Sequence, residues 1–139
     1  MAAGFQNKTL DTRTSNGLND TLLEPLVFIR ENGELIQAPI GGTTDGLSVP
    51  RCIQNIIPAT GGDWFSGVIH DSAYRNELQI LKNGVWVIAN YNQKECDDLI
   101  LEAMKYQEVN IVMRHTIYRA LRMFGSFAFK DDRKAPKTA

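Results

Sequence analysis

The chain has 139 residues, of which 43% are hydrophobic and 22% are charged, and its formal net charge is −1. This composition predicts one globular domain with a real core, and the balanced charge offers no basic field for nucleic acid or an anionic membrane. No apolar run is long enough to span a bilayer, and the N-terminus lacks the pattern of a signal peptide. The two cysteines, Cys52 and Cys96, occupy apolar positions of separate predicted helices, which favours buried free thiols.

Composition divides the chain into three segments. Residues 1–20 are polar and lack apolar periodicity, so we expect an N-terminal arm without a core of its own. Residues 21–126 form a single globular domain, and residues 127–139 form a charged C-terminal tail. We expect both terminal arms to dock on neighbouring proteins.

Two β-hairpins are predicted within the domain. In each, an Asn-Gly pair separates two short apolar runs, and both turn residues tolerate positive φ. The first hairpin pairs residues 26–29 with residues 35–38, and Pro39 ends its second strand. The second hairpin pairs residues 78–81 with residues 85–88.

A stretch rich in glycine and threonine, residues 41–51, follows the first hairpin. Glycines let backbone groups approach a ligand, so Asp45 within this loop is a candidate metal ligand or a hydrogen-bond partner for an imidazole. A turn aspartate that caps its own loop fits the same pattern. Ser48 and Pro50 then begin a short helix, which Pro58 closes.

The most informative stretch is the helix predicted over residues 63–76, after a Gly-Gly pair. At about 100° per residue, one side of this helix is apolar, and the other carries an imidazole, a carboxylate and a phenol. That polar side is a candidate site, although a buried network that ties two helices together would use the same residues. The apolar side consists of Trp64, Phe65, Val68, Ile69 and Ala73, and the polar side of Gly67, His70, Asp71 and Tyr74.

The next predicted helix covers residues 93–107 and begins at the capping residue Asn92. Asp97 lies on the boundary of its apolar stripe, where a carboxylate can face a neighbouring helix, whereas Asp98 projects into solvent. Asp97 is therefore the better site candidate of the two. The apolar stripe consists of Cys96, Leu99, Ile100, Ala103 and Met104.

The last predicted helix carries a regular apolar stripe and ends at Gly125. We expect its basic residues to face solvent or a partner protein, and we expect His115 to serve the surface. The stripe consists of Val109, Val112, Met113, Thr116, Ala120, Leu121 and Phe124, and the basic side of Arg114, His115, Arg119 and Arg122.

Together these elements predict an α+β fold with two β-hairpins and three to four helices. Its centre is a pair of antiparallel helices, residues 63–76 and 93–107, which a β-wing joins. The second hairpin forms this wing. The fold would thus bring the polar side of the first helix towards the boundary carboxylate of the second.

Three motifs in this order resemble a family of small phage and prophage proteins, domain of unknown function 1353. The motifs are T-D-G-x-S-V-P-R from Thr44 to Arg51, H-D-x-x-Y from His70 to Tyr74, and a helix start similar to A-D-x-x-F at Asp97. Cys96 and Ile100 replace the alanine and the phenylalanine of the third motif. The resemblance covers roughly residues 24–125 and implies a phage origin.

The H-D-x-x-Y helix is also similar, more distantly, to that of calcium-dependent secreted phospholipases and their parvoviral capsid versions. This resemblance implies that His70 is the general base that activates water and that Asp71 binds a calcium ion. It further implies that Asp97 orients the imidazole and that Tyr74 donates a hydrogen bond to Asp97. A neutral imidazole whose second nitrogen faces a carboxylate has the tautomer that such a reaction needs.

Several functions remain open at this point. One is a virion-associated protein of a phage tail or head, with a phospholipase-like site that helps the phage enter its host; its partners would be other phage structural proteins and a lipid or ester substrate. A second is a metal-dependent ester hydrolase without a structural role, and a third is a purely structural protein whose His-Asp-Tyr network ties the core. A nucleotide phosphohydrolase would need further histidine ligands, and His115 is the only other histidine. The expected location is the virion or the host cytoplasm.

Overall fold

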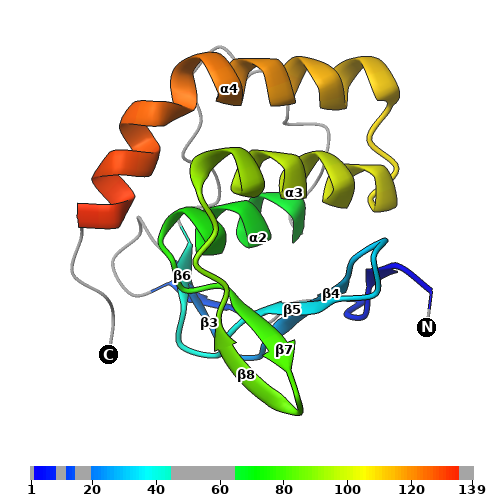
Figure 1. The fold of residues 1–139 in the computed structure, drawn as a ribbon, viewed down its shortest axis with the longest axis vertical. Coiled ribbons are helices and arrows are strands. Elements are labelled where there is room, and N and C mark those ends of the chain that lie inside the picture. Colours follow the sequence, from blue (N-terminus) through cyan, green and yellow to red (C-terminus); the bar gives the residue numbers. More distant parts are fainter. Residues whose placement is uncertain (1, 9–11, 15–19, 45–64, 135–139) are drawn as a thin grey trace.

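The computed structural model describes residues 2–8, 12–14, 20–44 and 65–134. A five-stranded antiparallel sheet lies on one side, α2 and α3 cover it, and α4 lies over these two helices (Figure 1). The strands of this sheet, in spatial order, are β1 (Gly4–Phe5), β4 (Leu26–Ile29), β5 (Leu35–Ala38), β7 (Gln79–Lys82) and β8 (Val85–Ile88). A second sheet consists of β2 (Thr12–Thr14), β3 (Asp20–Leu22) and β6 (Thr43–Thr44). The helices are α2 (Phe65–Tyr74), α3 (Gln93–Tyr106) and α4 (Ile111–Lys134).

The predicted α+β class and both predicted hairpins are confirmed. β4 pairs with β5, with Leu26 opposite Ala38. β7 pairs with β8, but β7 begins at Gln79, one residue after the predicted start at residue 78. In the second turn, Asn83 and Gly84 have φ values of 53° and 78°, which the Asn-Gly pair adopts at low cost. The wing thus leads from α2 to α3 as predicted.

The first described residues of the N-terminal arm pack on the domain. β1 pairs with β4 at the edge of the larger sheet, and the Phe5 ring lies 4.7 Å from the ring of Phe28 and 5.4 Å from that of Phe65. Two strand residues are too few to leave a periodic signal, and their partner is distant in the sequence. The proposed division at residues 20 and 126 stays a prediction, but ordered elements extend beyond both positions.

α2 is buried on every side, which the two-sided helical pattern did not indicate. All ten of its residues are buried, including Ser66, His70, Asp71 and Ser72. The cause is its position, because the sheet covers one side and α3 and α4 cover others. Buried polar side chains cost free energy unless they are hydrogen-bonded, so the polar side of α2 requires partners from its neighbours.

α3 confirms its prediction in detail. Asn92 accepts a hydrogen bond from the Glu95 amide at 2.8 Å, and the Glu95 side chain accepts one from the Asn92 amide at 3.0 Å, which closes a capping box. Burial raises the pKa of the Cys96 thiol to about 12, as befits a buried free thiol. Cys52 lies outside the described residues. The five residues of the predicted apolar stripe are all fully buried.

α4 departs from its predicted stripe. Ile117 and Leu121 are buried against α3, whereas Val112 and Phe124 are 74% and 55% exposed. The helix also continues through Gly125 to Lys134 and does not end at the glycine. The sequence carries apolar residues on two sides of this helix, and periodicity alone does not decide which side packs inward.

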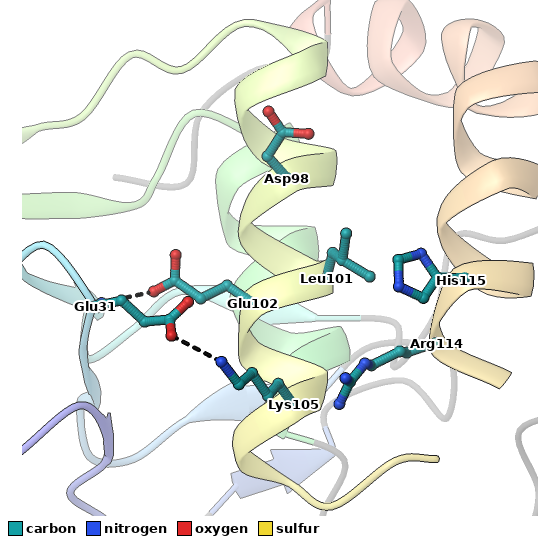
Figure 2. Close-up of a pocket in the computed structure, with 7 residues that line it drawn as sticks. All are labelled: Glu31, Asp98, Leu101, Glu102, Lys105, Arg114 and His115. Atoms are coloured by element: carbon teal, nitrogen blue, oxygen red, sulfur yellow. Dashed lines mark hydrogen bonds and ion pairs between the residues drawn. The ribbon is translucent and has the colours of Figure 1, made fainter. Parts of the chain in front are cut away.

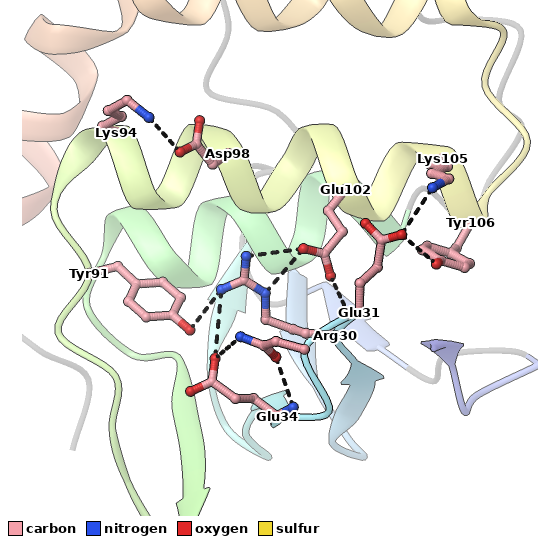
Figure 3. A network of polar contacts seen from close by, with 10 residues as sticks. Arg30, Glu31, Glu34, Tyr91, Lys94, Asp98, Glu102, Lys105 and Tyr106 are labelled. Carbon is pink, nitrogen blue, oxygen red and sulfur yellow. Dashed lines mark hydrogen bonds and ion pairs between the residues drawn. The ribbon is translucent and has the colours of Figure 1, made fainter. Parts of the chain in front are cut away.

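A polar network fastens the first hairpin to the outer side of α3 (Figure 3). Arg30 donates to Glu102 at 3.1 Å and to the Tyr91 hydroxyl at 3.2 Å, and the Glu31 amide donates to the second Glu102 oxygen at 3.0 Å. Lys105 forms an ion pair with Glu31 at 2.9 Å. These contacts fix the position of the first hairpin relative to α3. Among the described residues, no helix combines the length and the apolarity that a membrane crossing requires.

Candidate functional site

Three helices meet at the carboxylate of Asp97. Nε2 of His70 lies 2.9 Å from Oδ1 of Asp97, and the Tyr74 hydroxyl donates to the same oxygen at 2.6 Å. Nη1 of Arg122 on α4 donates to the other oxygen, Oδ2, at 3.0 Å. Asp97 is fully buried, and His70 is 3% exposed. The structure therefore brings together His70, Tyr74 and Asp97, as the sequence suggested, and adds an arginine.

Helix geometry explains why these side chains converge. His70 and Tyr74 are four residues apart on α2, so their rings lie on one face, with centroids 4.0 Å apart and planes tilted by 46°. α3 packs against that face, and Asp97 lies in the second turn of α3. Burial and the bond to Asp97 raise the pKa of the Tyr74 hydroxyl, so the phenol remains a donor.

The arrangement sets the tautomer of the imidazole. A carboxylate offers only acceptors, so Nε2 of His70 must carry the proton that points at Asp97. Nδ1 then keeps its lone pair, and it has no hydrogen-bond partner among the residues that the structure describes. An imidazole held in this way can accept a proton from water, while the carboxylate stabilises the resulting cation.

Arg122 is the residue that sequence reasoning missed. It was assigned to a solvated or partner-facing side, and its side chain is indeed 35% exposed, but its tip reaches the buried carboxylate. The helical periodicity could have indicated this position for Arg122. When Ile117, Leu121 and Gly125 are taken as the inward face of α4, Arg122 lies at the edge of that face. His115 is exposed, in line with its expected surface role.

Of the two predicted metal ligands, Asp71 lies in the described part of the chain. Asp71 is buried on α2, and Nε of Arg75 lies 3.4 Å from its Oδ1. Asp45 lies outside the described residues. Calcium needs six or more oxygen ligands, and the described residues contain no group of three acidic, histidine or cysteine side chains suited to a metal. The described residues alone therefore do not form a calcium site.

Gly125 allows α4 to approach the site closely. A Cβ atom at this position would lie 2.7 Å from the Tyr74 hydroxyl oxygen and 3.3 Å from Nε2 of Gln93. The hydroxyl cannot move freely because it donates to Asp97. Packing around Tyr74 therefore requires a glycine at position 125.

We expect Gly125→Ala to lower the free energy of unfolding by about 1–3 kcal/mol, because the overlap outweighs a gain in helix propensity of roughly 1 kcal/mol. Denaturant unfolding measures this change, with exposed Ser126→Ala as the matched control near zero. In a Tyr74→Phe background the cost of Gly125→Ala should shrink, since the overlapping oxygen is gone. An equal cost in both backgrounds would contradict the packing argument.

A separate groove of about 280 Å³ lies between α3 and α4 (Figure 2). Its acidic residues already have partners: Glu31 pairs with Lys105, Glu102 with Arg30, and Asp98 with Lys94. The acidic side chains of the groove are therefore compensated, and Asp97 is not among its lining residues. The lining residues are Glu31, Asp98, Leu101, Glu102, Lys105, Arg114 and His115.

The fold and the site define an α+β domain with a buried histidine–aspartate–tyrosine cluster between two antiparallel helices. The model of the family described as protein of unknown function (DUF1353) matches residues 20–121, and the chain belongs to this family. The matched range includes His70, Tyr74 and Asp97. Searches of curated proteins and of solved structures returned no match.

Proposed function

We propose that this protein is a phospholipase-like ester hydrolase in which His70 is the general base. The observation that carries the proposal is the 2.9 Å contact between Nε2 of His70 and Oδ1 of Asp97, which leaves Nδ1 as the basic nitrogen. The 2.6 Å hydrogen bond from Tyr74 supports it, because this bond fixes the carboxylate that orients the ring. Both contacts match the roles that the phospholipase resemblance implies.

The proposed chemistry needs few groups. Nδ1 of His70 accepts a proton from a water molecule as the water oxygen bonds to the ester carbonyl carbon. Asp97 stabilises the imidazolium through Nε2, and Arg122 and Tyr74 keep the carboxylate in place. The proton then passes to the leaving alkoxide as its bond to the carbonyl carbon breaks, which releases an alcohol and a carboxylic acid.

The setting and the cofactor are part of the same proposal. The resemblance to phage and prophage proteins supports a virion-associated protein of the tail or head that acts on host lipid. The resemblance to secreted phospholipases supports a calcium requirement, with Asp71 as one ligand and Asp45 as a candidate second. Phage structural proteins are the proposed partners, and they would dock through the N- and C-terminal arms.

The test is fatty-acid release from phospholipid vesicles with calcium or with a chelator. We expect calcium-dependent release by the wild type, a loss of about 10²–10⁴-fold in His70→Gln, and a comparable loss in Asp71→Asn. His115→Gln is the matched control, since it changes the exposed histidine, and its activity should equal that of the wild type. A wild type without turnover at any calcium concentration, or an active His70→Gln, would refute the proposal.

A second candidate is a purely structural role, which complete burial of the Asp97 carboxylate favours. Three donors from α2 and α4 converge on this group, as expected of a polar tie between helices. In that case His70→Gln lowers the melting temperature while the wild type shows no hydrolysis. The same assay, run with thermal unfolding, separates the two candidates.

A further inference from the structure

β8 is an edge strand of the larger sheet. It pairs with β7 on one side, and no described strand lies on its other side. Figure 1 shows the β7–β8 hairpin projecting from the domain on the side away from α4. Val85, Val87 and Ile88 are 59%, 39% and 48% exposed, and Trp86 is half-buried. Because neighbouring strand residues point in opposite directions, β8 presents apolar side chains on both of its faces.

The outward-pointing backbone groups of this edge belong to Trp86 and Ile88. In an antiparallel pair, hydrogen-bonded residue pairs alternate with non-hydrogen-bonded ones. The Ala89 amide donates to the Leu78 carbonyl at 2.8 Å, so by alternation Val87 is also hydrogen-bonded to β7. Trp86 and Ile88 occupy the other positions, and their amide and carbonyl groups point away from β7. These groups can bind a further antiparallel strand.

β8 lacks the features that usually prevent an edge strand from pairing. Proteins protect such edges with charged side chains, with proline or with a β-bulge. The sequence from Asn83 to Gln93 contains no charged residue and no proline, and the register of β7 and β8 is continuous. Lys82 is the only charged residue of the two strands, and it lies on β7, one strand away from the edge. The edge is therefore a template for another strand.

The strand is complementary to itself, which selects a second copy of the chain as its partner. In an antiparallel pairing centred on Val87, Trp86 of one copy lies opposite Ile88 of the other, so their outward-pointing backbone groups meet. An aromatic side chain opposite a β-branched one is a favourable cross-strand pair. Val87 then faces its own counterpart, and Val85 faces Ala89. Every pair across the junction is apolar, and no like charges meet.

The opposite edge of the sheet is a poorer partner for β8. β1 has only two residues, Gly4 and Phe5. Pairing of β8 with β1 of another copy would also generate an open chain of molecules, whereas pairing of β8 with itself closes a two-fold dimer, the commonest symmetry of protein oligomers.

We propose that this protein forms a two-fold dimer in which β8 pairs with β8 of a second copy, centred on Val87, so that the two larger sheets become one continuous sheet. The inference goes beyond the proposed function and does not rest on it, because no residue of the Asp97 cluster takes part. Two short strands bury less than the roughly 1,200 Å² of a standard interface, so we expect a dissociation constant of about 1–100 µM.

Sedimentation equilibrium of the full chain at up to about 300 µM tests the proposal. We expect a reversible equilibrium of monomer and dimer. Val87→Lys should weaken the dimer by more than about tenfold, because it places two like charges opposite each other at the two-fold axis. Val112→Lys is the matched control, since it makes the same change at a residue of α4 that is 74% exposed, and it should dimerise like the wild type. Circular dichroism establishes that both variants are folded.

Cysteine cross-linking tests the register independently of the lysine variant. In the non-hydrogen-bonded pair at the centre, the two Cα atoms would lie about 4.5 Å apart, which a disulfide can span. In a Cys52→Ser background, Val87→Cys should therefore form a disulfide-linked dimer. Val85→Cys should not, because its two copies would lie more than about 10 Å apart. Cys96 is buried and does not compete.

The possible results separate clearly. A chain that stays monomeric throughout the concentration range overturns the proposal, including one whose β8 edge binds an extended segment of a different protein. A dimer that Val87→Lys leaves unchanged, or that Val112→Lys weakens equally, also overturns it. Equal cross-linking of Val85→Cys and Val87→Cys excludes the register and with it the proposal. None of these measurements involves hydrolysis, so the proposed function is tested separately.

Discussion

Replacement of Asp97 by alanine is expected to lower the free energy of unfolding by about 3–5 kcal/mol, the cost typical of removing one partner of a buried ion pair. The carboxylate is fully buried and accepts hydrogen bonds from His70, Tyr74 and Arg122. Its removal leaves a cavity and three donors without their acceptor, and buried donors without acceptors are costly. Urea unfolding of the purified chain measures the difference.

The neighbouring aspartate provides the control. Asp98 lies one residue further along α3, and its side chain is 40% exposed, with Lys94 at 2.8 Å and the Tyr118 hydroxyl at 2.7 Å. Burial raises the pKa of its carboxyl, but the hydrogen bonds from Lys94 and Tyr118 outweigh this and lower the pKa. Such a surface pair contributes about 0–1 kcal/mol, so Asp98→Ala should have a small effect. Equal losses at both positions would contradict a special role for Asp97.

Replacement of Arg133 by alanine is expected to cost about 2–4 kcal/mol, although the sequence placed this residue in a charged tail. Its guanidinium donates to the Tyr74 carbonyl at 2.7 Å, to the Ala73 carbonyl at 3.0 Å, and to the carbonyl of Tyr91. These groups include the last carbonyls of α2, which lack partners within the helix. The guanidinium also lies over the Phe129 ring at 4.5 Å. A cation here stabilises the C-terminal end of α2.

Thermal and urea unfolding of three variants test this role. Arg133→Lys should recover little of the loss, because an ammonium group cannot reproduce the planar fork that reaches several carbonyls. Lys130→Ala changes an exposed cation on the same helix, and its effect should stay within about 0.5 kcal/mol. If Arg133→Ala unfolds like the wild type, the end of α4 does not hold α2.

The features that the sequence predicts correctly are those with local causes. The Asn-Gly turns and the Asn92 capping box depend on residues only a few positions apart, so a single stretch of sequence contains the whole signal. The apolar stripe of α3 is equally clear because its opposite side is polar. These elements are sufficient to place His70 and Tyr74 near Asp97, since antiparallel helices joined by a wing bring the H-D-x-x-Y face against the boundary carboxylate.

The features that the sequence does not predict depend on distant partners. β1 forms because Gly4 and Phe5 pair with β4 at the edge of the sheet, and such a short segment contains no sequence pattern that predicts this pairing. The inward face of α4 is ambiguous because apolar residues line two sides of the helix. If Phe124 is taken as a core residue, Gly125 is predicted to end the helix and Arg122 to face solvent. In the structure the helix continues through Gly125, which packs against Tyr74, and Arg122 reaches Asp97.

The most direct test of the central claim is the protonation of the His70 imidazole by nitrogen NMR of labelled histidine, with His115→Gln used to assign the signal. In the folded protein we expect a proton on Nε2, which faces Oδ1 of Asp97 at 2.9 Å, and a bare Nδ1. Asp97→Asn should perturb this signal. A proton on Nδ1, or on both nitrogens, would contradict a general base oriented by Asp97.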